Sequence, residues 1–232
     1  MKPISENLEI VKRNLRKAAE KAGREPSEVE LLAVSKTWPP EIVGEAAAAG
    51  QSLFGENKVQ EILAKAPVLP SHLRWHFIGH LQKNKIRKVL PLAEAVHSID
   101  SVELATQVDR IAAELGLHPK VYLQVNIADD GAKYGFTADD CARALDSLLE
   151  LPRLEIIGLM TIPAFDPDPE KTRPHFAALR KLRDRLSETV PLPGLSMGMS
   201  HDYEVAIEEG ATIVRVGSQI FGKRKTAPPP RS

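Results

Sequence analysis

The sequence predicts a single (β/α)8 barrel of the TIM type, preceded by an extra N-terminal helix. Apolar strand-like runs alternate with helix-like segments about eight times in 232 residues, which is close to the length of such a barrel. Several runs carry few polar residues, as VYLQVNI and LEIIGLM show, and strands buried on both faces are typical of parallel sheets. A doubly wound open sheet is the alternative, but no glycine-rich dinucleotide fingerprint follows the first strand.

The expected elements follow one another without a linker that would divide the chain. The charged stretch at residues 1–23 has a helical pattern. Strands are expected at Glu30 to Ser35, Leu53 to Gly55, Arg74 to Ile78, Ala95 to Ser98, Lys120 to Ile127, Leu154 to Met160, Gly194 to Met197 and Thr212 to Val216. Helices are expected to begin near Pro40, Val59, Lys83, Ser101, Thr137, Pro169, Asp202 and Ser218. The barrel should span residues 1–225, and the tail TAPPPRS, residues 226–232, should be disordered.

Composition excludes several classes of protein. The 31 basic and 31 acidic residues give a net charge of zero, so no overall field favours a nucleic acid or a membrane as partner. The single cysteine, Cys141, excludes an intrachain disulfide and a cysteine-based zinc site, and the scattered histidines show no metal-ligand spacing. The N-terminus lacks the apolar core of a signal peptide, and no apolar run approaches the roughly 20 residues of a membrane span. We therefore expect a soluble cytoplasmic protein.

Functional side chains should gather where the predicted strands end, because TIM-type barrels carry their sites at the carboxyl ends of the strands. In chain order these positions are Lys36, Glu56, Asn57, the segment His76 to His80, Asn126, Met160, Thr161, Ser200, His201, Arg215, Gly217 and Ser218.

Lys36 lies in LLAVSKTWPP, at the tip of an apolar run and just before a proline pair. A lysine in this place can lose water, so that its pKa falls and the neutral amine can attack an aldehyde to form a Schiff base. Taken alone, a solvated lysine at a strand end is the simpler interpretation.

The segments that follow the seventh and eighth strands favour a functional role for Lys36 over the solvated lysine. SMGMSHDYEVAI and RVGSQIFG each pass from a strand through a glycine and a serine into a helix, which makes an anion site from free N–H groups and the hydroxyls of Ser200 and Ser218. Either serine alone would be read as a helix cap. Two such turns on adjacent strands, beside Lys36 on the first strand, favour a phosphate site.

Arg215 ends the apolar strand ATIVRV, so its guanidinium needs a partner. That partner is either an ion pair, with Glu208 or Glu209 as the available carboxylates, or a ligand. A lysine for an aldehyde, two turns for a phosphate and a polar group for a ring nitrogen together describe pyridoxal 5′-phosphate.

Five segments in order resemble the signatures of the pyridoxal phosphate homeostasis protein family. They are AVSKT around Lys36, FGENKVQE, WHFIGHLQKNK, SMGMSHDYEVAI and RVGSQIFG, and together they span nearly the whole chain. The resemblance implies a barrel like the N-terminal domain of alanine racemase, which binds pyridoxal phosphate without established turnover. It also implies that Lys36 holds the cofactor as an internal aldimine, that Ser200, Gly217 and Ser218 contact the phosphate, and that Arg215 faces the pyridine nitrogen.

Two further positions match the family's ring pocket. Asn57 and His76 are implied to line it, although a lone histidine on an apolar strand is also compatible with a core position. One residue departs from the family pattern: Lys58 stands where the family usually has tyrosine in FGENYVQE. The departure is expected to alter ligand exchange at the pocket mouth rather than cofactor chemistry.

Two functions compete on this basis. The first is a carrier for intracellular homeostasis of pyridoxal phosphate, a form of vitamin B6, which buffers the cofactor or delivers it to apo-enzymes and is expected to be monomeric. The second is an amino-acid racemase or decarboxylase. Related racemases use a second base, a tyrosine from a further domain, which this chain is not expected to contain. A guanidinium at the ring nitrogen also weakens the ring as an electron sink, so the carrier is favoured.

Overall fold

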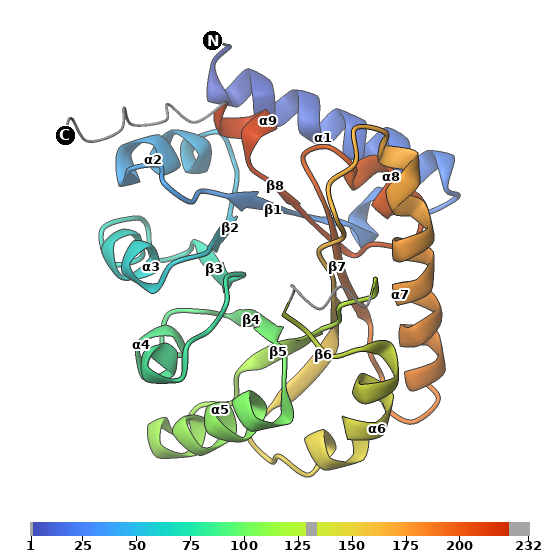
Figure 1. Cartoon of the computed structure of the whole chain (residues 1–232). Helices are drawn as coiled ribbons and strands as arrows, with labels where there is room; N and C mark the ends of the chain where they lie inside the picture. The colour runs from blue at the N-terminus through green and yellow to red at the C-terminus, as the bar shows by residue number, and fades with distance from the viewer. Residues whose placement is uncertain (1, 129–133, 223–232) are drawn as a thin grey trace, which may run out of the picture.

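The computed structural model describes residues 2–128 and 134–222, and it confirms the predicted class of fold. Eight parallel strands close into a barrel in chain order, with β8 paired to β1 (Figure 1). The strands are β1 (Glu30–Val34), β2 (Leu53–Glu56), β3 (Arg74–Phe77), β4 (Ala95–Ile99), β5 (Lys120–Gln124), β6 (Glu155–Met160), β7 (Gly194–Met199) and β8 (Ile213–Val216). All eight lie where the sequence predicts them. The predicted tail, residues 226–232, lies outside the described residues, and a barrel domain at 1–225 stays a prediction.

The helices surround the barrel and begin within a few residues of the predicted starts. They are α1 (Ile4–Lys21), α2 (Pro40–Ala48), α3 (Val59–Lys65), α4 (Ile86–Val89), α5 (Val102–Leu115), α6 (Ala138–Leu149), α7 (Arg173–Leu186), α8 (Tyr203–Glu208) and α9 (Ser218–Phe221), with short 3-10 turns at Pro26–Glu28, Lys83–Lys85 and Pro169–Thr172. Local signals fix several ends. The Ser101 hydroxyl accepts a bond from the Leu104 N–H at 3.2 Å to cap α5, which ends at Gly116 with a φ of 68°.

The predicted N-terminal helix, α1, lies across the outside of the barrel against α8 and α9 (Figure 1). It buries Leu8, Val11 and Leu15 on one face. The Asn7 side chain donates to the Ile220 carbonyl at 2.9 Å, and Arg24, just after the helix, donates to the Ile207 and Ala211 carbonyls. The helix therefore packs on α8 and α9, the two helices that follow the turns in which the sequence predicts a phosphate site.

Two cores hold the barrel together. The larger lies between the strands and the surrounding helices. The smaller fills the barrel interior and is built from Leu32, Leu53, Ile78, Ala95, Tyr122, Met160 and Ile213. Tyr122 fits because its neighbour on β7 is Gly194: a Cβ there would lie 2.6 Å from the tyrosine ring.

The fifth strand is shorter than predicted. It ends at Gln124, and not at Ile127, because the chain pairs with its own return segment at this point. The Phe136 N–H donates to the Gln124 carbonyl at 2.9 Å, and the Asn126 N–H donates to the Phe136 carbonyl at 2.8 Å. An apolar run continues through this turn, so the sequence pattern alone could not place the end of the strand.

No helix within the described ranges is long and apolar enough to span a bilayer.

Cys141 is buried on α6, where burial raises the pKa of its thiol to about 12. Of the basic residues in LQKNKIRK, Lys83 pairs with Glu103 and Arg87 pairs with Glu114, so this face is partly neutralised.

Candidate functional site

The predicted site residues converge at the carboxyl end of the barrel. Lys36 follows β1, Asn57 follows β2, Ser200 follows β7 and Gly217 follows β8. Barrel closure pairs β8 with β1 in register Ala33 to Val216, so the first and last strands end together. A Cβ on Gly217 would lie 3.1 Å from the Val34 carbonyl oxygen, so the glycine allows a close approach of the two strand ends. Residues nearly 200 positions apart in sequence thus share one end of the sheet.

Lys36 is half-buried in a turn directly after β1. The preceding residue, Ser35, is fully buried, and the following residue, Thr37, has a φ of 71°. Positive φ is uncommon for residues other than glycine, and it marks a backbone that its surroundings hold in place. The lysine therefore leaves the barrel from a fixed turn rather than from a loose loop.

The turns after β7 and β8 are tied to each other. The Gly217 N–H donates to the Ser200 hydroxyl at 3.1 Å, and the Gln219 side chain donates to the Ser200 carbonyl at 2.5 Å. Neither serine caps a helix, because α8 begins at Tyr203 and the residue before α9 is Gly217. The alternative that both serines are helix caps is therefore wrong. Ser218 is exposed at the start of α9, where the first N–H groups have no acceptor within the helix.

Gly198, the glycine of SMGMS, serves the packing of a helix on its strand rather than the anion site that the motif suggests. Its φ is 91°, and a Cβ would lie 2.5 Å from the Cβ of Ala206 and 2.9 Å from the Cα of Tyr203. The pairing of β7 with β8 also shifts register between Ser196 and Met199. The glycine thus lets α8 pack close to the strand it follows.

Arg215 is buried inside the barrel, with 4% of its surface exposed. Its Nη1 donates to the carbonyl and the hydroxyl of Ser196 at 2.8 and 2.6 Å, and its Nη2 donates to the Thr161 carbonyl at 2.9 Å. Burial lowers the pKa of Arg215 to about 10, with Asp202 acting in the opposite direction. No carboxylate of the described chain lies within ion-pair distance of the guanidinium. A buried cation held only by neutral groups favours a ligand that accepts from it.

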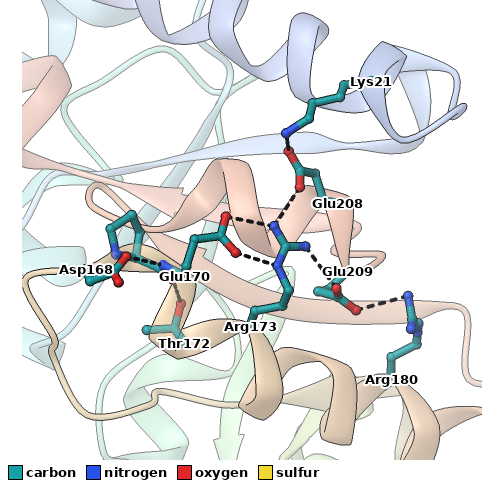
Figure 2. Close-up of polar contacts among 9 residues, drawn as sticks. Lys21, Asp168, Glu170, Thr172, Arg173, Arg180, Glu208 and Glu209 are labelled. Atoms are coloured by element: carbon teal, nitrogen blue, oxygen red, sulfur yellow. Dashed lines mark hydrogen bonds and ion pairs between the residues drawn. The ribbon is translucent and has the colours of Figure 1, made fainter.

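The two carboxylates considered as its partners lie elsewhere, as Figure 2 shows. Glu208 contacts Lys21 at 2.6 Å and Arg173 at 2.7 Å, and Glu209 contacts Arg173 at 3.0 Å and Arg180 at 3.2 Å. An ion pair of Arg215 with either glutamate is therefore ruled out. This outer network joins α1, α7 and α8, and so braces the helix that follows the Ser200 turn.

His76 begins a hydrogen-bond chain through the barrel interior. Its Nδ1 lies 2.9 Å from His97 Nε2, and His97 Nδ1 lies 2.8 Å from the Ser196 hydroxyl, which accepts from Arg215. A guanidinium can only donate, so the Ser196 hydroxyl oxygen accepts from Arg215, while the donor and acceptor in each of the two histidine contacts depend on the ring tautomers. His76 Nε2 is buried without a partner among the described atoms.

His76 and His97 are both neutral near pH 7. Burial lowers the pKa of His76 to about 4 and holds the pKa of His97 well below its ordinary value, with the positive charge of Arg215 adding to the effect at His97. Sequence reasoning considered His76 but missed His97 and Ser196. The signal was the alternation in AVHSI, which points His97 to the same face of β4 as Ala95.

Asn57 and Lys58 follow β2. The Asn57 side-chain oxygen is buried and has no partner in the described part of the chain. Gly79 lies against the Asn57 backbone, where a Cβ would be 2.0 Å from its carbonyl oxygen. Lys58 is exposed immediately before α3. Together with the lysine, the tied turns and the buried guanidinium, this end of the barrel offers an amine, N–H and hydroxyl donors, and a cation that forms no ion pair within the described residues.

Comparisons with known proteins place the chain in a family. Residues 7–225 match the family described as alanine racemase, N-terminal domain. The pyridoxal phosphate homeostasis protein of Aquifex aeolicus is 44% identical over 223 residues, covering 95% of this chain and 98% of that one. The protein of the same name from Pseudomonas aeruginosa is 43% identical over 232 residues, covering 99% of each.

Solved structures of similar fold are found as well. PipY of Synechococcus elongatus, solved with PLP bound, has a TM-score of 0.82 and 41% identity, covering 94% of this chain and 100% of that chain. A protein of unknown function from Bifidobacterium adolescentis has a TM-score of 0.88 and 37% identity, covering 94% of each. An alanine racemase from Clostridium difficile, at 16% identity and a TM-score of 0.74, shares the fold over 97% of this chain but only 57% of its own.

The buried histidines predict acid sensitivity. The unfolded chain protonates His76 near its ordinary pKa of 6.5, whereas the folded protein does so near 4, so stability falls as pH drops through that interval. Between pH 7 and 5, His76 should contribute a loss of about 2 kcal/mol in unfolding free energy. Denaturant unfolding of the wild type and His76→Gln at both pH values measures the contribution of His76 to this loss of unfolding free energy. The exposed His72→Gln variant is the control, and an equal pH dependence in all three proteins would contradict it.

Proposed function

The chain belongs to the pyridoxal phosphate homeostasis protein family, and from this premise we propose that its site binds pyridoxal 5′-phosphate. We further propose that the protein holds the cofactor reversibly, and so buffers it or delivers it to enzymes that need it. Pyridoxal phosphate supplies an aldehyde that reacts with amines and a ring that draws electrons from attached groups. The residues of this chain decide how tightly it is held and what the ring can do.

One observation carries the proposal: Arg215 is a buried cation with no carboxylate of the described residues within ion-pair distance, at the same end of the barrel as Lys36 and the tied turns. The donor set fits the cofactor. The amine of Lys36 suits an aldehyde, Ser200, Gly217 and Ser218 suit a dianionic phosphate, and the guanidinium suits the lone pair of a ring nitrogen.

Two further residues complete the proposed pocket. The unpartnered oxygen of Asn57 is an acceptor for a polar group of the ligand. His76 is proposed to act at the ring through the chain that ends on Arg215, since it is almost completely buried in the barrel interior. The exposed Lys58 is proposed to influence entry and exit of the ligand.

Catalysis of amino-acid reactions is the second candidate, and the geometry favours it less. With a pKa lowered only to about 10, Arg215 remains charged at neutral pH and cannot accept a proton, so it disfavours protonation of a ring nitrogen that it faces. The three tyrosines have contacts of their own: Tyr122 packs on His97, Tyr134 stacks on His80, and Tyr203 lies in the buried face of α8. A binding role without turnover is therefore proposed. We also propose a monomeric, cytoplasmic protein whose partners are apo-enzymes that use the cofactor.

The first prediction concerns the anchor. Purified protein should be yellow, and borohydride should fix the cofactor to Lys36. Lys36→Ala should lose the absorbance band and the fixed adduct, because no other lysine is proposed to reach the site. Absorbance spectra and peptide mass analysis after reduction measure this, with the exposed Lys88→Ala on α4 as control. Fixation at wild-type occupancy in Lys36→Ala would exclude Lys36 as the anchor.

The second prediction concerns the phosphate. Ser200→Ala and Ser218→Ala should each weaken retention without abolishing the covalent link, because each removes one bond to a charged group, about 1.5–3 kcal/mol. This corresponds to roughly tenfold or more in affinity. Dialysis against a cofactor scavenger measures the dissociation. Ser52→Ala, an exposed serine before β2, should behave as wild type, and unchanged retention in the double variant would place the phosphate elsewhere.

The third prediction concerns turnover. Alanine, serine, lysine and ornithine incubated with the loaded protein should be recovered without racemisation or decarboxylation at a useful rate. Binding the cofactor alone does not supply the groups that a transition state requires. Chiral and product chromatography provide the measurement. Turnover at an enzyme-like ~1 s⁻¹, abolished in Lys36→Ala, would establish the enzyme and overturn the carrier.

A further inference from the structure

The backbone on the carboxyl side of Lys36 is strained. Thr37 has a φ of 71°, and it is the one residue other than glycine with positive φ in the described ranges. Its β-branched side chain makes this conformation unfavourable, and such conformations persist only where the surroundings hold them. The strain adjoins the proposed anchor directly, which makes the groups that hold Thr37 the ones of interest.

A carboxylate from α3 holds Thr37. The Thr37 N–H donates to Glu61 Oε2 at 2.6 Å, a short bond to a charged acceptor. Burial opposes ionisation of Glu61, yet hydrogen bonds from Lys65 and from the Thr37 N–H keep the pKa of its carboxyl below the ordinary value. Glu61 is therefore ionised at neutral pH and holds the strained peptide from one side.

Lys65 connects this carboxylate to the other side of Lys36. Its side chain is 4% exposed, and its ammonium donates to Glu61 Oε2 at 2.9 Å, to the Ser35 carbonyl at 2.8 Å and to Glu56 Oε1 at 2.5 Å. These three bonds use all the donors of an ammonium group. One buried cation thus holds the residue before Lys36 directly and the residue after it through Glu61.

Glu56 completes the cluster at the end of β2. It is fully buried, its Oε1 also accepts from the Ser35 hydroxyl at 2.6 Å, and its Oε2 has no partner among the described atoms. Burial raises the pKa of this carboxyl to about 7, against the bonds from Lys65 and Ser35. Burying three ionisable groups is expensive, and buried ion pairs are weak evidence for a gain in stability. Their contacts instead concentrate on the two residues that flank Lys36.

We propose that Glu61, Lys65 and Glu56 are positioning residues, which fix the turn of Ser35, Lys36 and Thr37 so that the Lys36 amine is presented to the ligand in one orientation. This inference rests on the proposed role of Lys36 as the anchor. The cluster acts through the backbone on both sides of Lys36.

The decisive experiment uses rescue by glycine. Glu61→Ala should release the Thr37 N–H and slow the covalent capture of pyridoxal phosphate at Lys36 by roughly tenfold or more. Thr37→Gly in the same protein should restore most of the rate, because glycine adopts positive φ without strain and no longer needs the carboxylate. Thr37→Gly alone should capture at the wild-type rate. Glu45→Ala, an exposed glutamate on α2, is the matched control with and without Thr37→Gly.

Two measurements separate positioning from stability. Amide hydrogen exchange at Thr37 in the cofactor-free protein should rise in Glu61→Ala and remain protected in Glu61→Gln, whose side-chain oxygen still accepts. Thermal unfolding shows that each variant is folded at the temperature of the assay. If Glu61→Ala does not fold, Lys65→Met takes its place, with and without Thr37→Gly.

The outcomes distinguish this inference from the function on which it rests. Slow capture that glycine restores supports positioning. Capture at the wild-type rate in folded Glu61→Ala, or slow capture that Thr37→Gly leaves unchanged, overturns it while Lys36 remains the anchor. Capture at the wild-type rate in Lys36→Ala overturns both this inference and the proposed role of Lys36 as the anchor.

Discussion

The burial of the Arg215 guanidinium inside a closed barrel is the constraint on which the interior depends. A cation removed from water needs acceptors, and it finds the Ser196 carbonyl and hydroxyl and the Thr161 carbonyl. These groups are dipoles without net charge, and among the described residues no carboxylate lies within ion-pair distance of the guanidinium. The Ser196 hydroxyl that accepts from Arg215 also contacts His97, and His97 contacts His76, so the cation is connected to both histidines. Burial lowers the pKa of both histidines, and the charge of Arg215 adds to the effect at His97.

Barrel closure makes one site from two such buried systems. Arg215 lies on the β7 and β8 side, and Lys65 with its two glutamates lies on the β1 and β2 side. Both cations donate to backbone carbonyls: Ser35 for Lys65, Ser196 and Thr161 for Arg215. Two of these carbonyls also accept from the backbone, Ser35 from the Trp38 N–H and Ser196 from the Thr161 N–H, so the cations share acceptors that the turn and the sheet already use. The buried charged side chains thus tie neighbouring strands and turns to each other.

Much of this could be predicted from the sequence, and the reasons are specific. The apolar runs locate all eight strands, and the rule that parallel strands end together brings Lys36, Ser200 and Gly217 to one end. The partners of Arg215 could not be predicted, because Thr161 and Ser196 are distant in sequence and serve through backbone carbonyls that any residue would supply. In the sequence, Lys65 looks like an ordinary lysine on a helix. Only the structure shows that it reaches from α3 to the Ser35 carbonyl in the turn after β1.

The positive φ of Thr37 shows a different limit of sequence reasoning. A glycine at position 37 would indicate positive φ in the sequence, whereas a threonine does not. The conformation is held by the bond to Glu61 and is not favoured by the residue itself. Lys58 illustrates the converse. Its departure from the family pattern is plain in the sequence, yet the side chain is exposed before α3 and is not part of either buried system. For a ligand with a phosphate, an exposed cation acts on the rate of encounter and on its salt dependence, while the buried contacts govern how long the ligand stays. We therefore propose that exchange and retention are set by different residues, as a protein that both holds and releases a cofactor requires.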